Sequence, residues 1–276
     1  MMMPIQASSI NYSSWKWSEQ WSECIEPLHL APSIKACITS RHALNANGTA
    51  NFSLFVNEDP KLVYLRRTEL AKMLGYPIYW LSKQIHGTRV VNFSNTNFSE
   101  LITCISSHQY HFDEPADAVW TNRTNSIIGI LTADCLPILV WNQQGTYIAA
   151  IHAGWRGLQA GIIKNTVDSL NINPDELYAW IGPAIGTQAF QVGYDVYDAF
   201  CSQIPEATLA FYPDPKHPDK WLADLNLLAT MHLNAVGINN ITSSSICTSL
   251  DSEKWFSYRC SQQSGRFASL IWIEQR

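Results

Sequence analysis

Residues 126–161 contain two short apolar runs, and each run ends near a chemically reactive side chain. The run Ile127–Leu131 leads into Cys135, and the run Tyr147–Ile151 leads into His152. Both runs are rich in residues that favour strands, and both have the length of a buried strand. The sequence therefore predicts two strands that present a thiol and an imidazole at their C-terminal ends.

A third reactive side chain follows another segment with the pattern of a strand. The alternating run Pro77–Ile85 breaks at His86, which Gly87 follows. Two imidazoles and a thiolate form a donor set that suits zinc, and three protein ligands leave a fourth position open, as in catalytic zinc sites. A cysteine and a histidine are also the nucleophile and the base of cysteine hydrolases. We therefore take His86, Cys135 and His152 as candidate metal ligands, and Cys135 and His152 also as candidate catalytic residues.

Composition limits the classes of protein to which the chain can belong. At 276 residues, 46% of them hydrophobic, the chain can bury the core of one large domain or of two small ones. The formal charge of −5 and the lack of a basic stripe argue against a nucleic-acid partner. No apolar run has the length of a membrane span or of a signal sequence, so we expect a soluble cytoplasmic protein with no membrane partner. The seven cysteines lack C-x-x-C spacing, which predicts reduced thiols.

Turn and capping signals divide the rest of the chain into strands and helices. Residues 1–33 lack clear periodicity and are predicted to be an irregular lead-in, and residues 92–114 give only a weak, polar signal. Asp59 followed by Pro60 predicts the start of a helix, and Gly75 predicts its end. Further strands are predicted at Ile34–Thr39, Ile78–Ile85, Tyr178–Ile181, Ile241–Thr248 and Phe267–Ile273, and further helices at Leu158–Leu170, Val192–Phe200 and Leu222–Val236. With no internal repeat and no linker, this pattern indicates one α+β domain.

Four arginines lie beside these motifs and are candidate substrate-binding residues. They are Arg41, Arg156, Arg259 and Arg266. A phosphate or a carboxylate needs bidentate donors such as guanidinium groups, and we expect at least two of the four to bind an anion. The glycine-bounded turn at residues 182–186 lets backbone N–H groups approach a ligand, so Gly182 is a further substrate-binding candidate. Asp134 either caps a turn or, beside the thiol, orients a ligand or moves a proton, and we include it among the catalytic candidates.

Five motifs, taken in their order along the chain, resemble one known family. They are QIHG at residues 84–87, TADCLPIL at 132–139, HAGWRGLQAG at 152–161, IGPAIG at 181–186, and FSYR with SGRFAS between residues 256 and 269. The chain resembles the laccase-domain family, which is also named multicopper polyphenol oxidase, peptidoglycan editing factor or laccase-domain purine nucleoside phosphorylase. The resemblance implies a catalytic domain over residues 34–276, built as a single α+β domain of mixed β-sheets flanked by helices. It also implies one zinc ion bound by His86, Cys135 and His152.

The chain departs from the usual pattern of this family at two places near the substrate-binding candidates. Residues 40–60 keep Arg41 and Asn51 but lack the usual glycines, and Cys260 stands where a second arginine often follows the one matched by Arg259. The three candidate metal ligands are unaffected by these departures.

The sequence leaves three functional interpretations open. The first, which the resemblance implies, is a zinc enzyme that uses phosphate to cleave adenosine, inosine and methylthioadenosine and that also deaminates adenosine. The second is a cysteine hydrolase with Cys135 as nucleophile, for example one that edits peptidoglycan precursors, and metal content separates the two because Cys135 cannot easily be both ligand and nucleophile. The third, a copper-dependent polyphenol oxidase, ranks lowest because its copper centres need many histidines, usually in H-x-H pairs, and the eight histidines form none. We expect zinc as the cofactor, with copper as the weaker alternative, and a nucleoside and phosphate as ligands.

Overall fold

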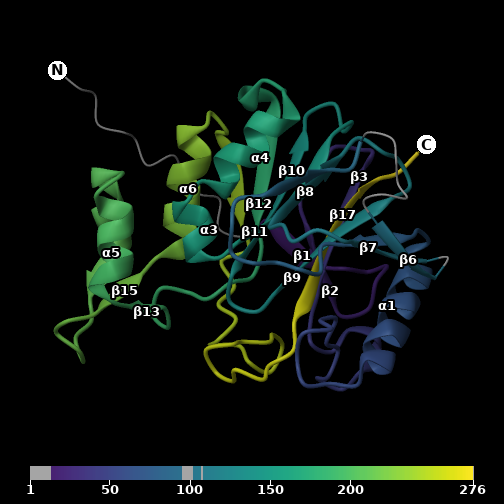
Figure 1. Cartoon of the computed structure of the whole chain (residues 1–276), viewed down its shortest axis with the longest axis horizontal. Coiled ribbons are helices and arrows are strands. Elements are labelled where there is room, and N and C mark those ends of the chain that lie inside the picture. The colour runs from purple at the N-terminus through teal and green to yellow at the C-terminus, as the bar shows by residue number, and fades with distance from the viewer. Residues whose placement is uncertain (1–13, 95–101, 107, 276) are drawn as a thin grey trace.

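Two β-sheets pack face to face at the centre of the molecule (Figure 1). The computed structural model describes residues 14–94, 102–106 and 108–275. The larger sheet has eight strands in the order β1 (Trp15–Trp17), β2 (Cys24–Pro27), β3 (Ile34–Thr39), β17 (Phe267–Ile273), β9 (Ile127–Thr132), β4 (Ile78–Trp80), β7 (Gln109–Phe112) and β6 (Ile102–Ser106). The smaller sheet has six strands in the order β16 (Asn240–Ser243), β12 (Leu177–Ile181), β10 (Leu136–Asn142), β11 (Ile148–Ala153), β8 (Ala118–Thr121) and β5 (Val90–Asn92).

The central strands are buried on both faces, which explains why their sequences read as continuous apolar runs. On β9, Ile128 and Ile130 share the core between the two sheets with Leu139 and Trp180 of the six-stranded sheet. The alternate residue Leu131 belongs to the core on the opposite face of β9. Each sheet contains both parallel and antiparallel pairs of strands, so the predicted mixed sheets are confirmed.

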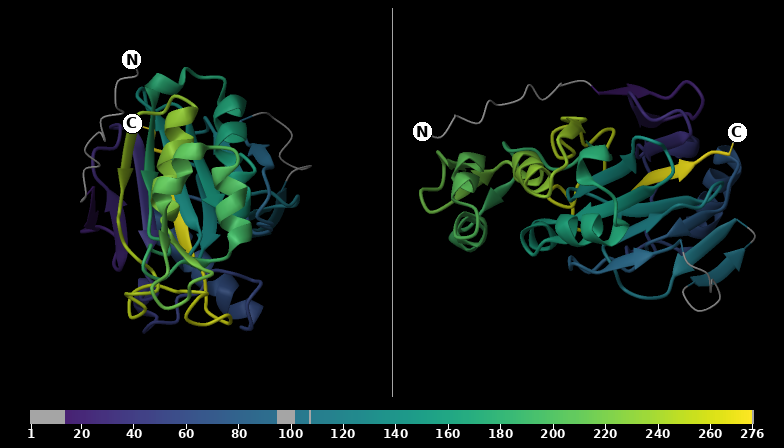
Figure 2. Two further views of the ribbon diagram at one scale, coloured as in Figure 1. Left: turned by 90° about the vertical axis from the view of Figure 1, so that its left-hand side faces the viewer. Right: turned by 90° about the horizontal axis from the view of Figure 1, so that it is seen from above.

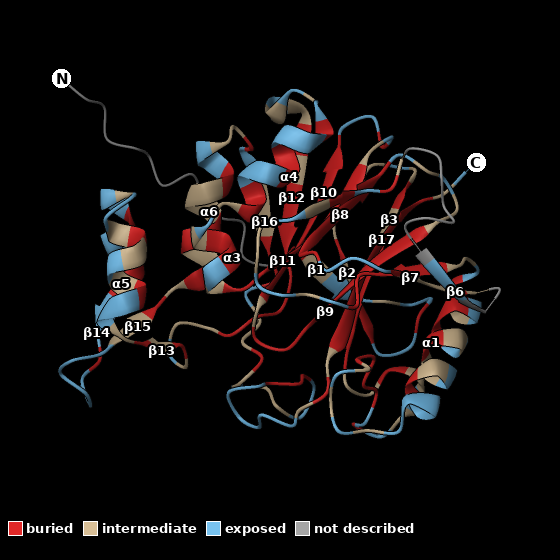
Figure 3. Ribbon diagram, in the orientation of Figure 1, coloured by how far each residue is buried: buried red, intermediate tan, exposed pale blue. Residues whose placement is uncertain are grey.

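Helices cover the two outer faces of this pair of sheets (Figure 1). The six-stranded sheet is covered by α3 (Trp155–Gln159), α4 (Ile162–Leu170) and α6 (Leu225–Ala235), and the eight-stranded sheet by α1 (Pro60–Leu74). Buried residues concentrate in the strands and on the inner faces of the helices (Figure 3). The fold is therefore the predicted single α+β domain of mixed sheets flanked by helices.

Helix α1 begins and ends at the predicted residues. The side chain of Asp59 accepts a hydrogen bond from the N–H of Lys61 at 3.0 Å, and Pro60 occupies the first helical position. Gly75 closes the helix in the left-handed conformation, with a φ of 84°. Of the helices in the described residues, none combines the length and the apolar character needed to span a lipid bilayer.

A small third sheet and helix α5 form a lobe beyond α6 (Figures 1 and 2). The sheet has the order β13 (Gln191–Val192), β15 (Trp221–Ala223) and β14 (Phe211–Pro213), and α5 (Tyr194–Cys201) and the 3-10 helix η3 (Pro205–Ala210) accompany it. Tyr197 stacks on Trp221 with ring centroids 4.8 Å apart, which fixes α5 against β15. Two further 3-10 helices are η1 (Ala43–Asn45) and η2 (Pro174–Glu176).

Two predictions for the first half of the chain are wrong. The lead-in of residues 1–33 is not irregular where the structure describes it, because β1 and β2 add this segment to the edge of the eight-stranded sheet. Residues 1–13 lie outside the described residues. The strand predicted at Ile78–Ile85 ends at Trp80. The polar region of residues 92–114 contains β6 and β7, while residues 95–101 and 107 lie outside the described residues.

Boundaries also shift in the second half of the chain. The helix predicted at Leu158–Leu170 is two helices, α3 and α4, because Gly161 between them has a φ of 96°. The helix predicted at Leu222–Val236 begins only at Leu225, where Asp224 caps α6. The preceding residues pair as β15 in the small sheet instead. The small sheet is therefore not predicted from the sequence, and the strand predicted at Ile241–Thr248 is β16, which ends at Ser243.

Candidate metal centre

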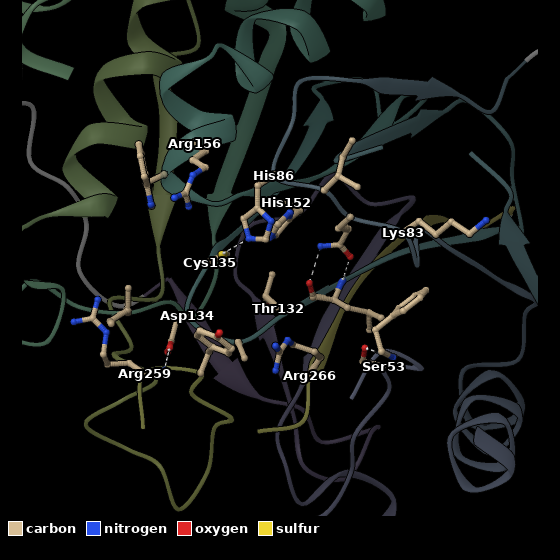
Figure 4. A pocket seen from close by; sticks show the side chains of 18 of the residues that line it. Ser53, Lys83, His86, Thr132, Asp134, Cys135, His152, Arg156, Arg259 and Arg266 are labelled. Atoms are coloured by element: carbon tan, nitrogen blue, oxygen red, sulfur yellow. Dashed lines mark hydrogen bonds between the residues drawn. The ribbon is translucent and has the colours of Figure 1, made fainter. Parts of the chain in front are cut away.

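The chain crosses from one large sheet to the other at residues 133–135, and this crossing places Cys135 where the two sheets meet. β9 belongs to the eight-stranded sheet, and β10 to the six-stranded sheet. His152 lies on β11, which pairs with β10, and His86 lies in the loop after β4. The ligand atoms of the three side chains lie within 4.8 Å of one another, and Sγ of Cys135 is 3.7 Å from Nε2 of His86 (Figure 4). The structure thus brings together the three candidate ligands.

Asp117, which is fully buried, holds both histidines of this cluster. Its Oδ1 accepts a hydrogen bond from Nδ1 of His152 at 2.8 Å, which leaves Nε2 of that ring for the cluster. The backbone N–H groups of Ile85, His86 and Gly87 donate to the same carboxylate at 3.3, 2.9 and 2.7 Å. Burial favours the neutral acid, but these bonds hold the pKa of Asp117 below its usual range. A carboxylate in this position orients a ligating histidine and raises its basicity.

The side chain of Gln84 ties the His86 loop to strand β9. Its amide N–H donates to the carbonyl oxygen of Leu131 at 2.7 Å, and its amide oxygen accepts from the N–H of Leu131 at 2.8 Å. The side chain thus takes the place of a neighbouring strand beyond the end of β4, while β9 continues to Thr132 through its pairing with β17 on the other side. The loop that carries one imidazole is thereby fixed relative to the strand that leads to the thiol.

Two glycines let the backbone approach the cluster closely. A Cβ atom on Gly154 would lie 2.6 Å from Cδ2 of His86 and 3.1 Å from Sγ of Cys135. A Cβ atom on Gly157 would lie 2.8 Å from the carbonyl oxygen of Gly87. His86 itself has a left-handed φ of 60°, which costs a non-glycine residue about 1 kcal/mol. The hydrogen bonds to the flanking loop offset this strain.

The thiol of Cys135 and the imidazole of His152 shift each other's pKa. Burial alone would raise the pKa of Cys135, but the neighbouring His152 and His86 lower it to about 6. Burial alone would lower the pKa of His152, but the charge of Cys135 and the hydrogen bond to Asp117 raise it to about 9. The pair therefore favours a thiolate and an imidazolium at neutral pH, and a metal that binds here displaces the proton of the imidazolium.

A cavity of about 760 Å³ opens in front of the cluster. Three of the four candidate arginines line it, namely Arg156, Arg259 and Arg266. The guanidinium of Arg156 lies 4.3 Å from the ring centroid of Trp155, and that of Arg259 donates to two backbone carbonyls of residues 189–191. Figure 4 shows Arg156 and Arg259 on the same side of the cluster. The aromatic side chains in the wall are Phe55, Trp155, Phe190 and Tyr258.

The other two substrate-binding candidates, Arg41 and Gly182, do not line this cavity. Arg41 donates to the carbonyl oxygens of Gly48 at 2.8 Å and Ser252 at 2.5 Å, so it joins two loops. A Cβ atom on Gly182 would lie 2.3 Å from Cδ1 of Ile38, so the glycine permits close packing of the two sheets. Both residues have structural contacts here, and their predicted contact with substrate stays a prediction.

The carboxylate of Asp134 faces the segment of residues 248–259. Its Oδ1 accepts a hydrogen bond from the hydroxyl of Thr248 at 2.6 Å. Its Oδ2 accepts from the hydroxyl of Ser257 at 3.0 Å and from the backbone N–H of Arg259 at 2.7 Å. Both oxygens are therefore engaged in holding this segment, which supplies one of the arginines of the cavity.

Sequence reasoning missed several residues of the site. They are Ser53, Lys83, Asp117 and Phe190, and the QIHG motif contains Gln84 without indicating its partner. Asp117 carries one readable signal, because it is an acidic residue directly before the wholly buried strand Ala118–Thr121. The other residues lie in segments whose sequences show no distinctive pattern.

Comparison with known proteins identifies the family. A family model described as multi-copper polyphenol oxidoreductase laccase matches residues 35–274. The chain belongs to this family. A purine nucleoside phosphorylase of Pseudomonas aeruginosa is 38% identical to this laccase-domain chain over 244 residues, which cover 87% of the chain and 94% of that relative. The purine nucleoside phosphorylase YfiH of Escherichia coli is 40% identical over 245 residues, with the same coverage of 87% and 94%.

Solved structures of similar proteins share the laccase-domain fold. A crystal structure of a Neisseria meningitidis protein, 36% identical, covers 92% of this chain and 100% of its own chain with a TM-score of 0.79. A crystal structure of the YfiH protein of Bacillus licheniformis, only 23% identical, covers 95% of this chain and 100% of its own with a TM-score of 0.82. The family membership expected from the motifs is thereby confirmed, together with the fold.

Proposed function

We propose that this laccase-domain protein is a zinc-dependent purine nucleoside phosphorylase that cleaves adenosine, inosine and methylthioadenosine with phosphate, and that it also deaminates adenosine. The observation that carries the proposal is the His–Cys–His cluster, which opens into a cavity lined by three arginines. This arrangement offers a Lewis-acid position beside donors for a phosphate. The names of the Pseudomonas aeruginosa and Escherichia coli relatives support the phosphorylase activity.

The donor set supports zinc as the metal. Two imidazoles and one thiolate are borderline-soft donors, and three protein ligands leave one position for another ligand. Within the part of the chain that the structure describes, this is the only group of three or more such donors, whereas a multicopper oxidase needs several histidine-rich centres. When bound, zinc supplies Lewis-acid chemistry and lowers the pKa of a water molecule.

In the proposed phosphorolysis, Arg156 and Arg259 hold the phosphate by charge-assisted hydrogen bonds. A phosphate oxygen forms a bond to C1′ of the ribose, the bond from C1′ to the base breaks, and the purine leaves with the electron pair and takes up a proton. Phe190 and Tyr258 offer aromatic faces to the base. Asp134 is then a positioning residue, because both oxygens of its carboxylate accept hydrogen bonds from the segment that carries Arg259.

The proposed activity is tested by incubating the zinc-loaded protein with adenosine, with and without phosphate, and by separating the products by chromatography. Adenine and ribose 1-phosphate are expected only with phosphate, whereas inosine is expected in both samples because deamination needs only water. Both activities should fall at least about a hundredfold in His86→Ala and in His152→Ala, since each variant loses a metal ligand. Absence of all three products from the zinc-loaded wild type would refute the proposal.

Arg156→Ala and Arg259→Ala are each expected to raise the KM for phosphate roughly tenfold or more, because each variant removes a charge-assisted donor. Metal content should stay unchanged, since neither guanidinium touches the cluster. Steady-state kinetics and elemental analysis provide the two measurements. Arg89→Ala is the matched control, because Arg89 forms an ion pair with Glu114 and does not line this cavity. An unchanged KM for phosphate in both variants would mean that the phosphate binds elsewhere.

One observation favours a second candidate function, a cysteine hydrolase. Cys135, His152 and Asp117 stand in the order nucleophile, base and carboxylate, and the pKa shifts favour a thiolate. This function predicts a metal-free protein whose Cys135 is rapidly alkylated and which cleaves a substrate such as a UDP-linked muropeptide precursor. One equivalent of zinc per chain, together with protection of Cys135 from alkylation, favours the phosphorylase.

The proposal includes a cytoplasmic location. All seven cysteines are free thiols, as is usual in a reducing compartment. Nucleosides and inorganic phosphate are small, soluble metabolites of that compartment, so location and activity agree.

A further inference from the structure

The buried cation Arg67 lies directly behind the wall of the cavity and has no anionic partner in the part of the chain that the structure describes. It belongs to α1, is fully buried, and lies over the ring of Trp80 at 4.3 Å from the centroid. Its guanidinium donates to the carbonyl oxygen of Phe52, to the hydroxyl of Ser82 at 3.3 Å and to Nε2 of His111 at 2.8 Å. None of the ion pairs among the described residues includes Arg67. A buried charge without a counter-charge is destabilising by several kcal/mol.

None of these three partners neutralises the charge. The carbonyl and the hydroxyl are uncharged groups. Burial first, and the charge of Arg67 second, lower the pKa of His111 to about 4, so this ring is neutral and accepts the hydrogen bond. Burial also lowers the pKa of Arg67 to about 9, so the guanidinium stays cationic at neutral pH. The cavity wall therefore has one uncompensated positive charge behind it.

Two hydroxyl groups and one lysine lie in front of Arg67 at the wall of the cavity. Ser53, Ser82 and Lys83 all line it. The oxygen of Ser82 accepts from Arg67, and the oxygen of Ser53 accepts from the N–H of Phe55 at 3.1 Å. Neither hydroxyl proton has an acceptor among the described residues. Lys83 is exposed, and its side chain extends away from the cluster to the carbonyl oxygen of Asp113 at 2.9 Å, so its ammonium reaches a ligand in the cavity only after it turns inward (Figure 4).

This part of the wall is fixed without the help of a ligand. The amide oxygen of Asn51 accepts the N–H groups of Ser53 and Arg266, both at 2.9 Å, and its amide nitrogen donates to the carbonyl oxygen of Ser53 at 2.9 Å. Arg67 holds the intervening carbonyl of Phe52. The hydroxyl donors are therefore already in place, and such donors bind an anion with little reorganisation.

We propose that Ser53, Ser82 and Lys83 form a second anion subsite, which binds a phosphate group and uses Arg67 as its buried counter-charge. Figure 4 shows Ser53 and Lys83 on the opposite side of the cluster from the two arginines that we assign to the phosphate co-substrate. The inference rests on the proposed function and extends its substrates to nucleosides phosphorylated on the ribose 5′ oxygen. The phosphate group belongs either to such a nucleotide or to inorganic phosphate, and the experiment separates the two.

The experiment measures binding to the zinc-loaded protein by calorimetry, with adenosine, adenosine 5′-monophosphate and inorganic phosphate as probes. The wild type is expected to bind the nucleotide at least about tenfold more tightly than adenosine, since its phosphate gains charge-assisted hydrogen bonds. This advantage should disappear in Ser82→Asp, because the new carboxylate pairs with Arg67 and repels the phosphate. The affinity for the nucleotide should fall roughly tenfold in Lys83→Ala. It should stay unchanged in the control Lys61→Ala, because Lys61 is an exposed residue of α1 that does not line the cavity.

Thermal unfolding in phosphate-free buffer tests the buried charge independently. Ser82→Asp is expected to melt at a higher temperature than Ser82→Asn, which has the same shape without the charge, because only the aspartate supplies the missing counter-charge. Equal melting temperatures of the two variants would overturn the inference. The inference would also be overturned if the wild type bound the nucleotide and adenosine with equal affinity and if Ser82→Asp left the binding of inorganic phosphate unchanged.

The remaining outcomes identify the source of the phosphate group. If Ser82→Asp weakens only the binding of inorganic phosphate, the subsite is supported and belongs to the co-substrate. If zinc-loaded wild type binds the nucleotide through the subsite but turns over neither adenosine nor the nucleotide, the subsite stands and the proposed function fails.

Discussion

Cys135→Ser is expected to lose the bound metal and, with it, on the order of a thousandfold of both nucleoside activities. The hydroxyl of serine is a much weaker ligand than a thiolate, so the two histidines alone must hold the ion. A Lewis acid contributes several kcal/mol to transition-state stabilisation, and about 1.4 kcal/mol corresponds to a tenfold change in rate. Elemental analysis of the purified variant and product chromatography provide the two measurements.

Cys104→Ser is the matched control for this experiment. Cys104 is an exposed thiol on β6, which is the edge strand of the eight-stranded sheet at the opposite end from β1. It is not part of the cluster. Its replacement should leave both metal content and activity at the wild-type level. A Cys135→Ser protein that retains one equivalent of metal would show that the thiol is not a ligand.

Asp117→Asn is expected to weaken metal binding roughly tenfold to a hundredfold and to lower the free energy of unfolding by about 3 kcal/mol. The amide keeps one acceptor oxygen and places an NH2 group against the donors of the other, which are either those of His86 and His152 or those of Ile85 and Gly87, so buried donors lose their acceptor. Competition with a chelator measures the affinity for the metal. Urea unfolding in the presence of excess chelator measures stability without a contribution from the metal.

Asp214→Asn separates the two effects. Asp214 is also buried, and its carboxylate accepts hydrogen bonds from Gln191 and from the N–H of Lys216 in the small lobe, away from the cluster. This control should lose stability and keep its metal affinity. If Asp117→Asn lost stability to a similar extent but kept its metal affinity, Asp117 would be a structural residue with no influence on the ligands.

Features that depend on neighbouring residues could be predicted from the sequence. The cap at Asp59 and the stop at Gly75 define α1, and the strands predicted at Ile34–Thr39 and Phe267–Ile273 have the predicted ends. Turn and capping signals act within a few residues, so a single sequence contains them in full. The three candidate ligands could be predicted because each of them lies within a distinctive motif.

Features that depend on partners far along the chain could not be predicted. Asp117 meets His152 across 35 residues, and Gln84 meets Leu131 across 47 residues. These contacts follow from which strands become neighbours, and hydrophobic patterns do not specify that order. The strands β1 and β2 have only three and four residues, too few to show a period, and they owe their conformation to pairing with β3.

The crossing of the chain from β9 to β10 has a consequence for how the protein responds to its metal. His86 follows a strand of the eight-stranded sheet, His152 lies on a strand of the six-stranded sheet, and Cys135 lies between them. An ion held by all three residues cross-links the two layers at one edge of their shared core. The affinity for the metal and the free energy of packing between the two sheets are then thermodynamically linked. A cavity-forming substitution deep in their shared core therefore weakens metal binding, although it touches no ligand. For a protein that binds this ion, metal supply would then affect how long the folded chain persists as well as how fast it works.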